Sequence, residues 1–203
     1  ISQTTAVRVS GIIAGRSIQS ISAFMRYLLT LCILLLASCG DGTDKQRLEQ
    51  ILLDAAEKGD RLQVNRMLQQ DIDINTQDLC FFTPLIKSSQ RGNLAVVKQL
   101  LKAGAMVNLS DKGGYTALMQ AAGNNHPEVV ETLLQAGADP DRVEYTHGWS
   151  ALIWAAKLGY DGPVAILLRY GADPGIHDDR QMRAADWARE EGHASTLQLF
   201  LDG

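Results

Sequence analysis

Along residues 83–203 the apolar positions recur at the spacing of short amphipathic helices. Two runs show this most clearly, and each forms one apolar stripe: Val97, Leu100 and Leu101, then Val130, Leu133 and Leu134. Runs of this kind are closed by Gly104, Gly137 and Gly171, the residue type that favours the left-handed conformation in which helices commonly end. The pattern predicts short helices separated by turns.

The helical pattern also repeats along the chain with a nearly constant period. Matching segments begin at residues 83, 116, 150 and 183, so the steps between them are 33, 34 and 33 residues. The segments are 83–108, 116–141, 150–175 and 183–203, and a further one, 52–75, lacks the opening turn. A single unit cannot bury both of its helices, so adjacent units are expected to stack on one another.

The residues that open each segment indicate how a unit is built. Thr83, Thr116 and Ser150 have hydroxyls suited to capping a helix, and Pro84 suits the first helical position. Together with the period, these openings resemble the ankyrin repeat, a unit of 33 residues. The resemblance implies an all-α ankyrin-repeat solenoid of helix-turn-helix units with hairpin-like turns. It covers 48–203 in about five repeats: 48–77, 78–110, 111–143, 144–177 and 178–203.

The sequence departs from the ankyrin pattern at several positions. The histidine of the family motif is replaced in four units, by Ile86, Met119, Ile153 and Asp186, so part of the hydrogen bonding between neighbouring turns is expected to be missing. The fourth turn, within 142–150, carries one extra residue. We therefore expect less regular stacking around that turn.

An apolar run of about ten residues, 27–36, lies near the N-terminus. It is too short to cross a bilayer as a helix, which takes roughly 20 residues. Met-Arg at 25–26 precedes the run and small residues at 37–38 follow it, which is the layout of a secretory signal. The sequence LASC, ending at Cys39, also resembles the bacterial lipobox, in which the cysteine is lipidated. A plain cleaved signal or anchor and a buried core helix are the alternatives.

The lipobox interpretation divides the N-terminal part of the chain. Residues 1–24 are predicted to be an upstream extension outside the working protein, 25–38 a lipoprotein signal peptide, and 39–47 the lipidated cysteine with a flexible tether. Residues 40–45, GDGTDK, reach at most about 20 Å when extended. By resemblance to lipoproteins, Gly40 favours sorting to the outer membrane. The expected location is therefore a bacterial membrane, on its periplasmic side.

Charge and chemistry exclude several function classes. Residues 1–38 contain three arginines and no acidic residue, so 16 basic and 23 acidic residues remain, a net charge of −7. Such a body has no basic stripe for nucleic acid. The three cysteines lack metal-ligand spacing, and no cofactor is indicated. His147 and Ser150 could suggest a hydrolase, but the repeat register makes them a turn-tip residue and a helix cap, so we predict no enzymatic activity.

Ankyrin repeats usually bind proteins through their turn tips and the inner face of their first helices. We predict partner contacts at the turn-tip stripe, the residues directly before each cap, and at an inner set near the ends of the first helices. The alternative for the stripe is that each side chain folds over its neighbouring turn, and Trp154 and Trp187 are interpreted as packed between repeats. The turn-tip stripe is Phe82, Tyr115, Trp149 and Met182, and the inner set is Gln90, Arg91, Asn124, Lys157, Leu158 and Glu190.

The resulting hypothesis is a non-catalytic lipoprotein, expected to be monomeric, that binds a protein in or near the envelope. It would act as an inhibitor, such as an immunity protein, or as an accessory factor for an envelope-acting protein. The alternative is a structural or quality-control component without a dedicated partner. Neither hypothesis involves nucleic acid or a small-molecule substrate.

Overall fold

The computed structural model describes residues 40–201, with side chains from residue 44. The predicted upstream extension, signal peptide and Cys39 lie outside the described residues. Within residues 40–201 the regular elements are helices, and the turns contribute only the isolated bridges Ser110–Thr116 and Val143–Ser150. The predicted all-α class is confirmed.

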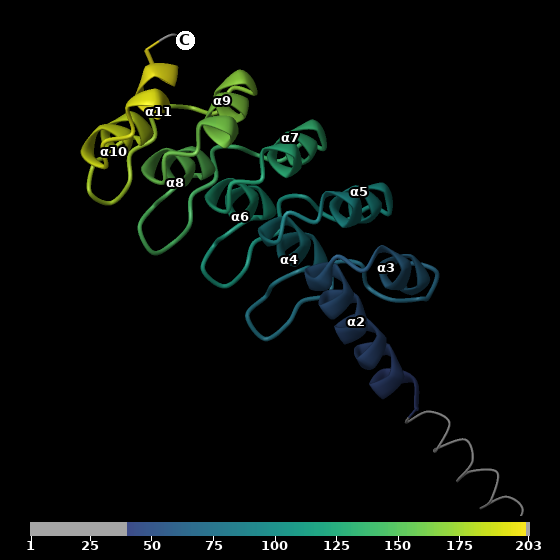
Figure 1. The fold of residues 1–203 in the computed structure, drawn as a ribbon. Coiled ribbons are helices and arrows are strands. Elements are labelled where there is room, and N and C mark those ends of the chain that lie inside the picture. Colours follow the sequence, from purple (N-terminus) through teal and green to yellow (C-terminus); the bar gives the residue numbers. More distant parts are fainter. Residues whose placement is uncertain (1–39, 202–203) are drawn as a thin grey trace, which may run out of the picture. The chain divides into compact units, whose positions relative to one another are not determined.

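The helices come in pairs that follow one another in chain order, and the long loops project from the side of the first helices (Figure 1). The first helices of the five pairs are α2 (Gly40–Lys58), α4 (Pro84–Gln90), α6 (Ala117–Gly123), α8 (Ala151–Lys157) and α10 (Ala184–Glu190). The second helices are α3 (Arg61–Met67), α5 (Leu94–Lys102), α7 (Pro127–Gln135), α9 (Asp161–Arg169) and α11 (Ala194–Leu199).

Local side chains fix where the first helices start. The hydroxyls of Thr83, Thr116 and Ser150 each accept a hydrogen bond from the backbone N–H three residues later. Pro84 is the first residue of α4, where its missing N–H costs nothing. In the last unit Arg183 takes the cap position, and Asp186 accepts its backbone N–H. The predicted caps are therefore confirmed.

Small side chains let the first helices approach one another closely. Ala121 and Ala122 of α6 and Ala155 and Ala156 of α8 are fully buried, and α4, α6, α8 and α10 pack against one another in that order. Both helices of the three central pairs supply large core side chains, namely Leu85, Leu100, Leu118, Leu133, Leu152 and Leu167. Each pair thus buries its apolar stripe against the next pair, as the repeat predicts.

Main-chain hydrogen bonds join neighbouring turns, although the family histidine is absent. The N–H of Lys112 donates to the carbonyl of Cys80 at 3.1 Å, that of Tyr145 to Gly113 at 2.8 Å, and that of Asp179 to His147 at 2.9 Å. The fourth turn is hydrogen-bonded to the third turn through Tyr145 and to the fifth turn through His147. The prediction of less regular stacking around residues 142–150 was therefore wrong.

The extra residue of the fourth turn is matched by a longer side chain. Asp111 accepts the backbone N–H groups two and four residues later, and Asp78 and Asp178 do the same in their turns. In the fourth turn Glu144 replaces aspartate, and its carboxylate reaches the N–H groups two, three and five residues later. The additional methylene of glutamate spans the additional residue, which keeps the turn in register.

The flexible tether predicted at residues 39–47 is not observed where the structure describes it. Helix α2 already begins at Gly40, so residues 40–47 form its first two turns. Leu48, Ile51 and Leu52 pack against the core and hold the helix in place. Among the described helices, none combines the length and apolar character needed to cross a membrane.

Candidate functional site

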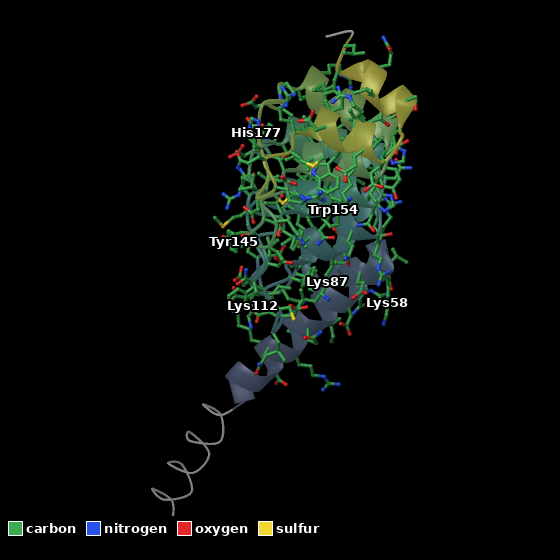
Figure 2. The ribbon with its side chains drawn as sticks, turned by 90° about the vertical axis from the view of Figure 1, so that its left-hand side faces the viewer. Lys58, Lys87, Lys112, Tyr145, Trp154 and His177 are labelled. Atoms are coloured by element: carbon green, nitrogen blue, oxygen red, sulfur yellow. The ribbon has the colours of Figure 1, made fainter. Side chains whose placement is uncertain are left out.

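The turns and the first helices together form one face of the stack, which we call the inner face. Figure 2 shows Lys112 and Tyr145 along the edge made by the turns, with Lys87 and Trp154 on the face beside it. Lys58, in the last turn of α2, lies toward the opposite edge. Both predicted sets of binding residues belong to this face, because the turn-tip stripe precedes the first helices and the inner set ends them.

The four residues of the turn-tip stripe are half-buried and pack against the core. The ring of Tyr115 contacts Trp154 of the next repeat at a centroid distance of 5.3 Å. Trp149 contacts Trp187 of the next repeat at 5.9 Å, edge to face. The side chains therefore fold over their neighbours, as the alternative interpretation describes, and Trp154 and Trp187 lie between repeats. A role of the stripe in binding stays a prediction.

Asp178 holds the two tryptophans of the last contact together. Its Oδ2 accepts both indole N–H groups, from Trp149 at 3.1 Å and from Trp187 at 2.8 Å. Its Oδ1 accepts the backbone N–H groups of Arg180 and Met182, each at 2.9 Å. Burial alone would raise the pKa of this carboxyl, but the four donors lower it below its ordinary value. Each carboxylate oxygen of Asp178 therefore already accepts two hydrogen bonds within the fold.

Ion pairs connect the first repeats across the inner face. Lys87 lies 3.3 Å from Glu57 and 3.1 Å from Asp78, and Arg91 lies 2.7 Å from Glu57. Hydrogen bonds from Arg91 and Lys87 lower the pKa of Glu57. Partial burial would lower the pKa of Lys87, but its two carboxylate partners raise it. These ion pairs make the N-terminal end of the inner face polar.

The inner set divides into exposed and half-buried side chains. Arg91, Asn124, Leu158 and Glu190 are exposed. Three of them also have partners on the surface, because Arg91 pairs with Glu57, Asn124 donates to the carbonyl of Gln120 and Glu190 pairs with Arg180. Gln90 and Lys157 are half-buried, because Gln90 donates to Gln120 at 3.2 Å and Lys157 pairs with Glu191 at 2.5 Å. The exposed members occupy the ends of successive first helices. They are available to a partner without breaking the core.

His126 and His193, which directly precede helices α7 and α11, cross-link neighbouring repeats. The Nε2 atom of His126 lies 3.2 Å from the carbonyl oxygen of Gln90, and that of His193 lies 3.1 Å from the carbonyl oxygen of Lys157. Asn93 bonds the carbonyl oxygens of Ala56 and Glu57 in the same way. These histidines therefore have a structural role in joining the repeats.

Sequence reasoning missed the turn carboxylates, which are Asp78, Asp111, Glu144 and Asp178. The signal was present, because an acidic residue occurs at the same register in four units.

His147 and Ser150 have the predicted roles, since His147 is exposed beside Glu144 and Ser150 caps α8. Cys80 is an exposed free thiol. Within residues 40–201, the part of the chain that the structure describes, no group of three or more His, Cys, Asp or Glu is placed to hold a metal ion.

Comparison with known proteins agrees with this architecture. Residues 52–144 match a family model of ankyrin repeats in three copies, and residues 147–179 match a single ankyrin repeat. The chain belongs to the ankyrin-repeat family. A similar protein is the ankyrin repeat protein nuc-2 of Neurospora crassa, which is 36% identical over 63 residues. That match covers 31% of this ankyrin-repeat chain and 6% of the fungal protein, so the chain spans a small part of that relative.

Proposed function

We propose that this ankyrin-repeat protein is a non-catalytic, membrane-anchored lipoprotein that binds a protein partner in the bacterial envelope. In this role it acts as an inhibitor or an accessory factor of an envelope-acting protein. The family supports the coarser part of the proposal, because ankyrin repeats imply protein–protein interaction. The lipobox-like sequence ending at Cys39 supports the anchor.

The observation that carries the binding role is a contrast between two positions of the same repeat. One buried position of the first helix holds small residues in successive units, such as Ser88, Ala121 and Ala155. Three residues later the position is exposed, and its side chains are chemically unrelated: Arg91, Asn124, Leu158 and Glu191. Packing explains the uniform position. The variable position lies outside the core, so its side chains can differ without a loss of packing, which suits recognition of one specific partner.

The short chain between Cys39 and the first repeat favours a partner close to the membrane. Helix α2 begins at Gly40, the residue after that cysteine, and even a fully extended chain from Cys39 to Asp44 would span at most about 18 Å. Lipid chains on Cys39 would hold the repeats within this reach of the bilayer surface. A net charge of −7 on the remainder of the chain gives a mild preference for a basic partner.

Partner capture from detergent-solubilised envelope tests the proposal with the full chain. The parent is compared with an inner-face variant, Arg91→Ala/Asn124→Ala/Leu158→Ala, and with a control that alters exposed residues of the second helices, Lys98→Ala/Glu128→Ala. A protein retained by the parent and the control but lost by the inner-face variant would support a dedicated binding surface.

Two other outcomes would argue against the proposal. Equal recovery by all three proteins would place the binding site elsewhere, and no specific recovery would favour the structural alternative. The anchor is tested separately by incorporation of labelled palmitate into the parent and into Cys39→Ser. Equal incorporation would refute lipidation at Cys39.

A further inference from the structure

A pocket of about 290 Å³ lies between the fourth and fifth turns. His147 and Trp149 line it from the fourth turn, Asp179 and Arg180 from the fifth turn, and Trp187 from α10. The rings of His147 and Trp149 are stacked with their centroids 4.6 Å apart, and Trp149 meets Trp187 edge to face. Three aromatic rings from two repeats therefore converge on one small space.

Cations of the chain itself already lie against these rings. The Nζ atom of Lys157 is 3.6 Å from the centroid of Trp187 and 5.8 Å from that of Trp149. The guanidinium carbon of Arg180 is 4.7 Å from the centroid of Trp187. The negative face of an aromatic ring attracts cations, and indole attracts them most strongly. The tryptophans thus present faces that accept positive charge.

Arg180 is only weakly held in its place. Its ion pair with Glu190 measures 3.6 Å, and the two side chains are 60% and 48% exposed. Exposed pairs of this kind contribute little to stability because water and salt screen them. Lys157 differs, because it pairs with Glu191 at 2.5 Å and is 22% exposed. An incoming cation can therefore displace Arg180 while Lys157 remains.

The charge around the pocket also favours a cation. Asp179 is exposed, and within the described residues its carboxylate has no hydrogen-bond or ion-pair partner. Asp178, by contrast, already accepts four hydrogen bonds. The charged side chains near the pocket carry a combined charge of −2: Asp178, Asp179, Glu190 and Glu191 against Lys157 and Arg180. One carboxylate is therefore available to a positively charged guest.

We propose that this pocket binds an arginine side chain of the protein partner. Its guanidinium would lie against the aromatic walls in place of Arg180 and donate N–H groups to Asp179. A guanidinium suits this site better than an ammonium, because it is planar, stacks on aromatic rings and bonds a carboxylate through two N–H groups. The inference rests on the proposed binding function, and it adds the chemistry by which the partner is recognised.

The test uses the full chain in detergent micelles and the blocked peptide acetyl-Gly-Arg-Gly-amide as probe. The same peptide with citrulline in place of arginine is its neutral counterpart of nearly equal shape. NMR signals of the indole N–H groups of Trp149 and Trp187 report on the pocket directly. We expect the arginine peptide to shift both signals in a saturable manner and the citrulline peptide to leave them unchanged.

Two variants that change exposed residues test recognition of the peptide without disturbing the core. Asp179→Asn should weaken arginine-peptide binding about threefold to fivefold, because it removes an exposed charge partner. Arg180→Ala should tighten binding by about threefold, because it removes the internal competitor. Asp71→Asn and Arg142→Ala change exposed residues of the same types outside the pocket, and both should leave the affinity unaltered.

The proposal fails if both peptides shift the indole signals equally, if neither does, or if Arg180→Ala leaves the arginine-peptide affinity unchanged. These outcomes are distinguishable from a failure of the proposed function. A captured envelope protein with no arginine-peptide binding would refute only the pocket. Arginine-specific binding with no captured envelope protein would refute the envelope role and leave the pocket supported.

Discussion

Glu144 offers the sharpest test of how the fourth turn is held. Its side chain is fully buried, and its carboxylate accepts backbone N–H groups from Thr146 at 2.6 Å, His147 at 2.7 Å and Trp149 at 3.2 Å. In Glu144→Gln one oxygen becomes an NH₂ group, which then faces a backbone N–H instead of accepting from it. A buried donor left without an acceptor costs roughly 1–3 kcal/mol.

We therefore expect Glu144→Gln to lower the free energy of unfolding by about 2 kcal/mol. For a domain of this size each kcal/mol shifts Tm by about 2–4 °C, so Tm should fall by roughly 4–8 °C. Glu144→Asp keeps the charge but loses the methylene that spans the longer turn, and we expect it to cost about 1–2 kcal/mol. Urea unfolding followed by circular dichroism measures both values.

Glu128→Asp is the matched control, because it shortens an exposed glutamate and should change stability by less than about 0.5 kcal/mol. Equal stability of Glu144→Gln and the parent would refute the reasoning, since the carboxylate would then contribute nothing beyond a neutral acceptor. Loss of stability in Glu144→Gln without any loss in Glu144→Asp would show that charge matters and reach does not.

The same carboxylate predicts how stability depends on pH. Burial by itself would raise the pKa of Glu144, but the hydrogen bonds from Thr146, Trp149 and His147 lower it below its ordinary value of 4.5. A depressed pKa in the folded state means that the contribution is present above pH 4.5 and is lost as the pH falls through the folded-state pKa. Glu144→Gln should therefore lose less stability than the parent on acidification below pH 4.5, and parallel losses would contradict this prediction.

Three further changes are expected to alter stability, each measured by urea unfolding. Gly123→Ala should destabilise by about 1–3 kcal/mol, because the new Cβ would lie 2.6 Å from the indole of Trp154; a gain in stability, as for an ordinary helical glycine, would contradict the close packing. Gln181→Gly should stabilise by about 1 kcal/mol by relieving a φ of 61°, and an unchanged value would show that the strain does not exceed the entropy that glycine adds to the unfolded chain. His193→Ala should cost about 1 kcal/mol through the lost bond to the carbonyl of Lys157, and unaltered stability would mean that this cross-link is dispensable.

Much of the fold could be predicted from the sequence, because the controlling interactions lie within a few residues. The caps at Thr83, Thr116 and Ser150 bond N–H groups three residues away, and a period of 33 or 34 residues is readable directly. The apolar stripes then require stacking, since one unit cannot bury them alone. Helix pairs, turn positions and the order of packing follow from these local rules.

The candidate site was only partly predictable, because it depends on contacts between residues about 30 positions apart. The period aligned Trp149 with Tyr115 and Trp187 with Trp154, but it could not show that Trp149 and Trp187 share the carboxylate of Asp178. Side-chain rotation and the offset between stacked repeats determine that arrangement. The same holds for Glu144, because only the path of the longer turn shows why the additional methylene is needed.

The sequence by itself therefore determined the repeats, their helices and the residues that face the core. Only the tertiary structure decided how the turn-tip side chains fold over their neighbours. It also decided which turn carboxylates accept hydrogen bonds within the fold and which carboxylate at the last turns remains available to a partner. The physical reason is the sequence separation over which each interaction acts. Capping and helical periodicity act between near neighbours along the chain, whereas ring contacts and shared carboxylates exist only after the repeats have stacked.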